Sequence, residues 1–234
     1  MRRVAPAGLP QPPISASSAL RLRRVRALRE PAPGVYLLSI DGSDPFLPGQ
    51  TLALGLEEDG PSRFYSIASG TADPCTEVLF DLVPGGALTP RLAVLEPGDP
   101  VYVSRPFGAF VDVGGPTVWI AAGTGVAPFR SMVRSMGAGW RAAKILVHGS
   151  RTLSGLDSSR LLAEALGPRY HPCCSGEEAP DVFHGRVTGW LARHDLPVAS
   201  RYMLCGSAAM VVDVRDLLLS RGIPLASVAA EIYF

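Results

Sequence analysis

TVWIAAGTGVAP, residues 117–128, is the stretch that decides the fold of the second half of the chain. Its first six residues are apolar or β-branched, as in a strand that is buried on both faces of a parallel sheet. Gly123 and Gly125 follow directly, and Pro128 suits the first turn of a helix, where its missing N–H costs little. A strand, a glycine-containing turn and a helix start in this order indicate an α/β unit whose turn lets backbone approach a phosphate.

The same pattern continues toward the C-terminus. KILVHG at 144–149 and RYMLCG at 201–206 predict two further buried strands. Helices are expected between and after the strands, at 127–136, 157–166, 186–193 and 207–221. Ser207 suits the N-cap of the last helix, and Gly222 follows its end. Alternating strands and helices predict a doubly wound parallel sheet over residues 115–234.

Toward the N-terminus the pattern changes to short alternating runs that are separated by turn residues. Six runs predict strands: LRLRRVRAL (20–28), GVYLLSID (34–41), TLALGLEE (51–58), RFYSIAS (63–69), EVLFDLVP (77–84) and VYVS (101–104). Six strands of this kind predict an antiparallel barrel over residues 19–114, capped by a short helix at 88–95. Residues 1–18 are rich in Pro, Ala, Ser and Arg, and we expect them to form a disordered tail.

Charge and hydropathy exclude several classes of protein. The formal net charge is +1, and the charges are interspersed, whereas a nucleic-acid binder needs a concentrated basic surface. No apolar run reaches the roughly 20 residues that span a bilayer, and the N-terminus lacks the apolar core of a signal peptide. We therefore expect a soluble, cytoplasmic monomer that binds neither nucleic acid nor membranes.

The four cysteines are Cys75, Cys173, Cys174 and Cys205. They contain no C-x-x-C pair, and no histidine cluster with metal spacing accompanies them. This pattern does not fit a zinc site or an iron–sulfur cluster of ordinary type, so no metal is expected.

The tetrad Arg63-Phe64-Tyr65-Ser66 lies at the start of a predicted strand. Strand alternation puts Arg63 and Tyr65 on one side and Ser66 on the other. A cation, an aromatic face and a hydroxyl within four residues suit an isoalloxazine ring with a pyrophosphate tail. The tetrad also fits an ordinary strand, so its interpretation depends on the neighbouring motifs.

Three motifs follow one another along the chain: Arg-x-Tyr-Ser at 63–66, Gly86-Ala87-Leu88-Thr89, and the glycine-containing turn at 123–128. In this order and spacing the chain resembles the ferredoxin–NADP reductase family, over about residues 20–234. Further matching segments are Pro48-Gly49-Gln50, Pro97-Gly98-Asp99 and Arg105-Pro106-Phe107-Gly108. The resemblance is to the bacterial single-function type without a fused iron–sulfur domain. It implies an FAD-dependent oxidoreductase that moves a hydride from NAD(P)H to flavin N5 and then single electrons to a carrier protein.

The resemblance also implies roles for residues of the barrel. Arg63 would bind the flavin pyrophosphate, Tyr65 would pack on the flavin, and Ser66 would form a hydrogen bond near N5. Gly86 belongs to the motif that ends in Thr89, and Thr89 would meet the pyrophosphate at the start of the short helix, where N–H groups favour an anion.

Residues of the second half complete the implied site. The residues implied in binding the dinucleotide are Gly123, Thr124 and Gly125 for its pyrophosphate, and Ser150, Arg151 and Arg186 for a ribose phosphate. Cys205 and Glu231 would join Ser66 around the reacting carbon as catalytic residues. Tyr233 or Phe234 would cover the flavin; the sequence does not decide which.

The sequence gives two opposing indications about the nucleotide. Arginine side chains after the predicted strands favour NADPH, because a ribose phosphate needs cationic donors. Gly176, however, stands where bacterial relatives commonly carry an arginine, and the charge of Glu177 would repel a phosphate. NADPH is therefore the expected nucleotide, and NADH stays possible.

Three functions stay open at this point. The first is a ferredoxin or flavodoxin reductase, the second is the reductase component of an oxygenase system that uses NADH, and the third is a non-enzymatic flavin-binding interaction protein. The combination of Ser66, Cys205 and Glu231 argues against the third, because a binding module does not need all three. Five arginines could dock an acidic carrier or simply form a solvated strand face: Arg21, Arg23, Arg24, Arg26 and Arg29.

Overall fold

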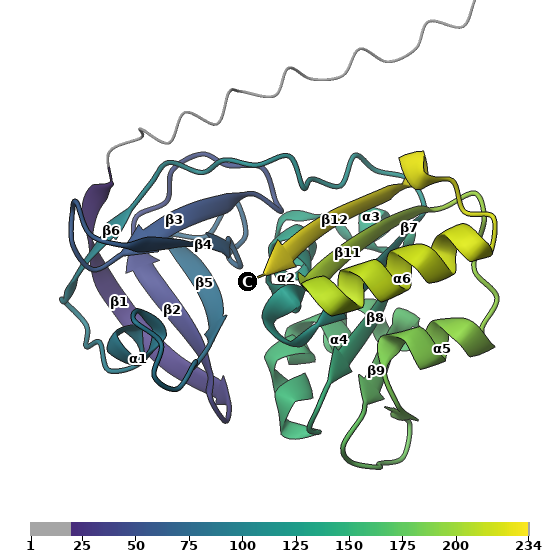
Figure 1. The fold of residues 1–234 in the computed structure, drawn as a ribbon. Helices are drawn as coiled ribbons and strands as arrows, with labels where there is room; N and C mark the ends of the chain where they lie inside the picture. The colour runs from purple at the N-terminus through teal and green to yellow at the C-terminus, as the bar shows by residue number, and fades with distance from the viewer. Residues whose placement is uncertain (1–19, 234) are drawn as a thin grey trace, which may run out of the picture.

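The structure of the protein is a computed structural model that describes residues 20–233. The expected tail at 1–18 and the terminal Phe234 lie outside the described residues. Two sheets of six strands form two lobes that lie side by side (Figure 1). Within residues 20–233, no helix is both long and apolar enough to cross a membrane.

The first sheet is antiparallel and has the strand order β4-β3-β6-β1-β2-β5. Its strands are β1 (Arg21–Ala32), β2 (Val35–Asp41), β3 (Thr51–Gly55), β4 (Ser62–Ser66), β5 (Cys75–Asp81) and β6 (Pro100–Val103). The two edge strands meet where Ile67, directly after β4, bridges Val78 in β5. This contact closes the sheet, which confirms the expected six-stranded antiparallel barrel.

Apolar side chains fill the interior of the barrel. Ile40, Leu54 and Val101 belong to one buried cluster that reaches across the sheet, and Leu92 closes it at one end. Leu92 comes from α1 (Thr89–Leu92), which is shorter than the expected helix at 88–95. The helix ends early because the chain has to turn at Gly98, where φ is +98°, before it enters β6.

The second sheet is parallel and has the order β10-β9-β8-β7-β11-β12. Its strands are β7 (Thr117–Ala122), β8 (Lys144–Ser150), β9 (Tyr170–Cys174), β10 (Phe183–His184), β11 (Arg201–Ser207) and β12 (Val228–Tyr233). The helices are α2 (Ala127–Ser135), α3 (Ala138–Arg141), α4 (Arg160–Leu166), α5 (Val187–Arg193) and α6 (Ala208–Ser220). The doubly wound parallel sheet predicted from the sequence is therefore confirmed.

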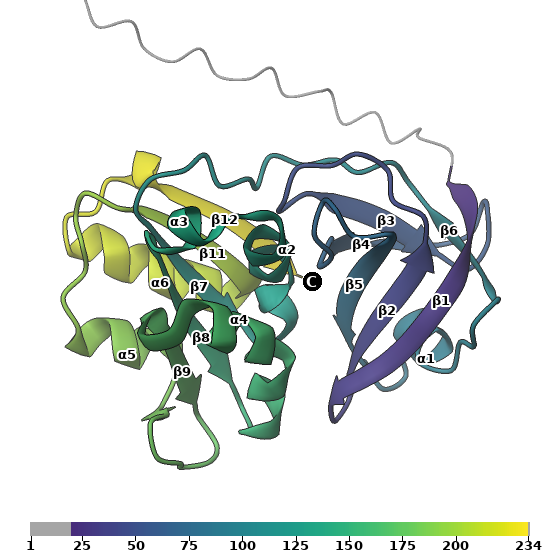
Figure 2. The same cartoon turned by 180° about the vertical axis from the view of Figure 1, so that it is seen from behind.

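Alternate residues of β7 explain why this strand reads as a continuous apolar run. Trp119 and Ala121 pack in the cluster that contains α2 and α4, whereas Val118 and Ile120 pack in the cluster that contains α5 and α6. Figure 1 shows α6 in front of the sheet, and Figure 2 shows α4 in front of it from behind. Both faces of the sheet are thus covered.

The helix predictions differ in how well they match. The helix at 207–221 is confirmed: Ser207 is its N-cap and accepts a hydrogen bond from the Met210 N–H, and Gly222 follows with φ of +79°. The helix expected at 157–166 is split into a 3₁₀ turn over Ser154–Ser159 and α4. Strand β9 was not predicted, because its sequence YHPCC is short and contains a proline that reads as a strand breaker.

The segment between the lobes is fixed by a buried ion pair. Nζ of Lys144 lies 2.8 Å from Oδ2 of Asp112, and both side chains are fully buried. Asp112 also accepts a hydrogen bond of 3.1 Å from Nε1 of Trp119, and Lys144 donates to the carbonyl oxygen of Gly115 at 2.8 Å. The pair therefore anchors the connection to β7 and β8; the domain boundary at 114/115 stays a prediction.

Helix α2 joins the lobes on another side. Arg134 contacts the carboxylates of Glu77 and Asp73 in the barrel lobe, each at 2.7 Å. Glu77 also pairs with Arg29 of β1 at 3.1 Å, although only 4% of its side chain is exposed. A buried carboxylate is thus shared between both lobes, which fixes how they face each other.

We expect Lys144→Met to lower the free energy of unfolding by about 3–5 kcal/mol, because it leaves the Asp112 carboxylate buried without a cation. The double variant Lys144→Met/Asp112→Asn removes that charge as well and is expected to lose less than Lys144→Met alone. Urea unfolding followed by circular dichroism measures both. Arg160→Met breaks an exposed pair with Glu164 and serves as the control, with a change within about 0.5 kcal/mol. A double variant less stable than Lys144→Met would contradict this account.

Candidate active site

A cleft of about 560 Å³ opens between the two lobes, and its size is typical of a small-molecule site. One wall is formed by the barrel strands β3, β4 and β5 and by the loop before α1. The other wall is formed by Thr124, after β7, and by the end of β12. The cleft therefore lies at the carboxyl ends of parallel strands, where open α/β sheets place their ligands.

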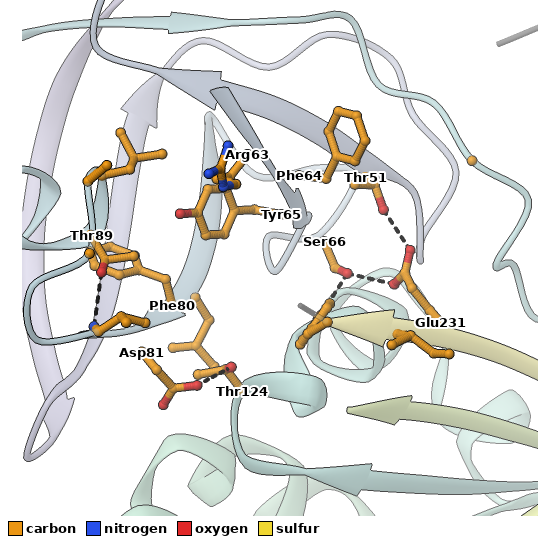
Figure 3. Close-up of a pocket in the computed structure, with 18 of the residues that line it drawn as sticks. Thr51, Arg63, Phe64, Tyr65, Ser66, Phe80, Asp81, Thr89, Thr124 and Glu231 are labelled. Atoms are coloured by element: carbon orange, nitrogen blue, oxygen red, sulfur yellow. Dashed lines mark hydrogen bonds between the residues drawn. The ribbon is translucent and has the colours of Figure 1, made fainter. Parts of the chain in front are cut away.

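All four residues of the tetrad at 63–66 line this cleft (Figure 3). The Tyr65 ring packs edge to face on Phe80 with ring centroids 6.2 Å apart, and burial raises the pKa of Tyr65 to about 12. The guanidinium of Arg63 is exposed and donates a hydrogen bond only to the neighbouring Ser62 carbonyl, at 3.0 Å. An aromatic face and a cation therefore lie side by side along one wall.

The carboxylate of Glu231 joins the two lobes at the inner end of the cleft. Its Oε1 accepts a hydrogen bond of 2.8 Å from Thr51 Oγ1, and its Oε2 accepts one of 2.7 Å from Ser66 Oγ. Because Ser66 donates its proton to Glu231, its oxygen accepts from the Tyr233 hydroxyl, which lies 2.8 Å away. Tyr233, Ser66 and Glu231 thus form a directed chain of hydrogen bonds. Figure 3 shows the bond between Ser66 and Glu231.

Cys205 lies beside this chain because β11 and β12 are neighbours and Cys205 is in register with Glu231. Its Sγ is 3.9 Å from Glu231 Oε2, and the side chain is fully buried. Burial, and secondly the nearby Glu231, raise the pKa of the Cys205 thiol well above its usual value. The structure therefore brings the three expected catalytic residues together and keeps the thiol protonated.

The loop before α1 forms the outer wall. Gly86 and Thr89 line the cleft, and Thr89 Oγ1 accepts a hydrogen bond of 2.9 Å from the Val83 N–H. The hydroxyl proton of Thr89 is then free to be donated to a ligand. With only four residues, α1 contributes little dipole, so the expected effect of its N-terminus depends on this hydroxyl and on local N–H groups.

The glycine-containing turn is a 3₁₀ turn over Gly123–Val126 that leads into α2, with a proline at the helix start as expected. A Cβ on Gly125 would lie 2.2 Å from the carbonyl oxygen of Cys205, so only glycine fits between β7 and β11. This close approach brings the turn next to Cys205. Thr124 Oγ1 donates a hydrogen bond of 2.6 Å to Asp81 Oδ2 across the cleft.

A buried histidine, His148, forms a hydrogen bond with the same turn. Nε2 of His148 lies 3.1 Å from the Gly123 carbonyl oxygen, and Nδ1 lies 2.9 Å from Ser159 Oγ. A carbonyl only accepts, so the proton sits on Nε2, and burial lowers the pKa of His148 to about 4. Neutral His148 therefore holds the turn at Gly123 in place.

The structure does not bring every expected residue to the cleft. Six of the expected residues within 20–233 do not line it. They are Gly123 and Gly125 in the turn, the fully buried Cys205, Ser150 at the end of β8, Arg151 directly after it, and Arg186 at the N-cap of α5. The Arg151 carbonyl accepts a hydrogen bond of 2.9 Å from the Gly176 N–H, and Glu177 Oε2 accepts one of 2.7 Å from the Leu153 N–H. The roles of Ser150, Arg151 and Arg186 toward a ribose phosphate stay a prediction.

Sequence analysis did not single out several residues of the cleft, among them Thr51, Asp81 and Phe64. Thr51 was not singled out, because nothing local to a threonine in a strand indicates that it meets a carboxylate 180 positions away. Asp81 was not singled out either, because its partner Thr124 belongs to the other lobe. Phe64 belongs to the tetrad at 63–66, but a phenylalanine in a strand carries no functional signal of its own. In the structure it is 66% exposed and packs edge to face with Phe107.

No family model matches the chain. A flavodoxin/ferredoxin–NADP reductase of Rhodobacter capsulatus is 34% identical over 211 residues, which cover 76% of this chain and 77% of the relative. The toluate 1,2-dioxygenase electron transfer component of Pseudomonas putida is 28% identical over 187 residues, which cover 76% of this chain and 56% of the relative.

Among solved structures, a ferredoxin NADP⁺ reductase from Neisseria gonorrhoeae with bound FAD and NADP has the same fold. Its TM-score is 0.82 at 21% identity, and the match covers 93% of this chain and 100% of that chain. This match shows that the two chains share a fold. The 34% identity to the Rhodobacter capsulatus reductase shows the family. The chain belongs to the flavodoxin/ferredoxin–NADP reductase family.

Proposed function

We propose that the protein is an FAD-dependent ferredoxin/flavodoxin–NADP⁺ reductase that oxidises NADPH and passes electrons to a carrier protein. The observation that carries the proposal is that Ser66 and Glu231 meet at the inner end of the cleft, with the buried Cys205 beside Glu231. These side chains come from both lobes, so the cleft joins the wall that suits a flavin to the turn that suits a dinucleotide.

The cleft fits FAD in its shape and its chemistry. Its walls include Leu79, Phe80 and Tyr65, which offer apolar and aromatic surface to a planar ring. Arg63 and Thr89 offer a cation and a free hydroxyl proton to a pyrophosphate. Bound FAD would supply what no side chain can, namely acceptance of a hydride and release of single electrons.

The residues at the inner end would orient the reacting groups and hold a proton. Tyr233 donates to Ser66 and Ser66 donates to Glu231, so the Ser66 hydroxyl has a fixed direction. Oε2 of Glu231 is the acceptor at the end of this chain, so its negative charge would keep the Ser66 hydroxyl oriented. Tyr233 would be the aromatic residue that covers the flavin and has to shift when a nicotinamide ring approaches.

NADPH is the proposed nucleotide, as the names of the flavodoxin/ferredoxin–NADP reductases among the relatives suggest. Arg151 and Arg186 are exposed and could reach a ribose phosphate. The Glu177 carboxylate is already bonded to the Leu153 N–H, which partly offsets the repulsion expected from its charge. NADH stays the alternative.

The electron acceptor is proposed to be ferredoxin or flavodoxin. The alternative, an oxygenase component, is favoured by the similarity to the Pseudomonas putida electron transfer component. The β1 arginines give little support to a docking site, because Arg21 and Arg23 contact Asp44 and Arg29 pairs with Glu77. A non-enzymatic role would give no function to the hydrogen bonds that link Tyr233, Ser66 and Glu231.

The purified protein is expected to show flavin absorption bands that NADPH bleaches faster than NADH. Anaerobic stopped-flow mixing with each nucleotide measures the two rates. Steady-state turnover with purified ferredoxin, flavodoxin and a Rieske-type oxygenase component then ranks the acceptors. A colourless protein that cannot be reconstituted with FAD would contradict the proposal.

Glu231→Gln is expected to slow flavin reduction by at least about tenfold while flavin content stays normal, because the variant loses the charge that orients the Ser66 hydroxyl but keeps the side-chain shape. Anaerobic stopped-flow reduction at saturating NADPH measures the rate. Glu164→Gln, on the exposed face of α4, is the control and should reduce at the wild-type rate. An unchanged rate in Glu231→Gln would remove this residue from the catalytic set.

Arg63→Ala is expected to weaken FAD binding by about tenfold or more, because a charged hydrogen bond to phosphate is lost. Fluorescence of flavin released during dialysis measures the dissociation constant. Arg160→Ala, which also removes an exposed guanidinium, should bind FAD as wild type does. Equal flavin retention in the two variants would show that Arg63 does not hold the pyrophosphate.

A further inference from the structure

The hydrogen bond between Asp81 and Thr124 connects the two walls of the cleft. Asp81 is the last residue of β5 in the barrel, and Thr124 lies in the turn after β7. Figure 3 shows the two side chains pointing toward each other, and their oxygens are 2.6 Å apart. Both residues line the cleft, so a ligand that reaches the turn meets this contact first.

Asp81 covers the hydroxyl that a phosphate would need. Thr124 is only 6% exposed, whereas Asp81 is open toward the cleft. The surrounding protein still desolvates the carboxylate enough to raise the pKa of Asp81, and within residues 20–233 no cationic side chain forms an ion pair with it. An unpaired carboxylate at an anion-binding turn works against binding of the anion, because both compete for the same donor.

We propose that Asp81 is a latch that weakens dinucleotide binding: it holds the Thr124 hydroxyl in the free protein, and the dinucleotide pyrophosphate has to displace it. The inference rests on the proposed function and deepens it. A latch of this kind would also speed release of the product NADP⁺, because Asp81 can take back the hydroxyl as the phosphate leaves. Asp81 acts through Thr124 and does not touch the reacting atoms, so it is a positioning residue.

The latch makes a selective prediction about two ligands. NADP⁺ carries the pyrophosphate that competes with Asp81, whereas 2′-AMP carries only the adenosine end and its ribose phosphate. Asp81→Asn removes the charge and keeps the shape. We expect it to lower the dissociation constant of NADP⁺ by roughly fivefold to tenfold, and to leave that of 2′-AMP unchanged.

The measurement is a titration of the oxidised flavoprotein with NADP⁺ or 2′-AMP, followed by the difference absorption spectrum of the flavin and by competition. Asp195→Asn is the matched control, because it removes one exposed carboxylate in the segment that leads into β11, at the opposite end of the sheet. It should bind both ligands as wild type does. Asp81→Ala, which also removes the acceptor, should tighten NADP⁺ at least as much as Asp81→Asn.

A double-mutant cycle tests whether the effect passes through Thr124. Thr124→Val removes the shared donor and is expected to weaken NADP⁺ binding, and adding Asp81→Asn should then give no gain. A gain that persists in the Thr124→Val background would overturn the latch mechanism.

The remaining outcomes separate the latch from the proposed function. If wild type is reduced by NADPH but Asp81→Asn binds NADP⁺ equally or more weakly, the latch is wrong and the Asp81–Thr124 bond instead preorganises the turn. If tightening extends equally to 2′-AMP, the latch is also wrong. If wild type holds no flavin and binds no NADP⁺, the proposed function fails and the latch with it.

Discussion

The carboxylate of Glu231 is the group on which the geometry of the cleft depends. It lies on the last strand of the parallel sheet, yet both of its oxygens accept hydrogen bonds from hydroxyls of the barrel. A carboxylate that accepts from two fixed donors has one orientation. Glu231 therefore fixes the end of β12, the direction of the Ser66 hydroxyl and the position of Cys205 across the strand pair in a single arrangement.

Most of the fold could be predicted because its signals are local. The apolar run of β7, the glycines after it and the N-cap at Ser207 each depend on a few neighbouring residues, and each lies where expected. Strand β9 and the true length of α1 could not be predicted in the same way. Their extents depend on neighbours in space, since β9 is stabilised by pairing with β8 and α1 is limited by the turn into β6.

The residues of the candidate site also divide into those with a local sequence signal and those whose role depends on neighbours in space. Arg63, Tyr65 and Ser66 belong to a tetrad that sequence alone can single out, and Gly125 carries a signal because no other residue fits beside Cys205. Thr51 and Asp81 carry no such signal, since each acquires its role from a partner in the other lobe. The contacts of Thr51 and Asp81 with the other lobe are therefore the part of the site that only a three-dimensional structure reveals.

The burial of Lys144 has a consequence for how a carrier protein can be attached or located. Lys144 is the only lysine of the chain, and its ammonium is enclosed by Asp112 and the Gly115 carbonyl. The basic side chains that the described surface presents are thus guanidiniums and imidazoles. Reagents that join two lysine amines would find no lysine target there, so mapping a complex by chemical cross-linking has to use arginine-directed or carboxylate-directed chemistry.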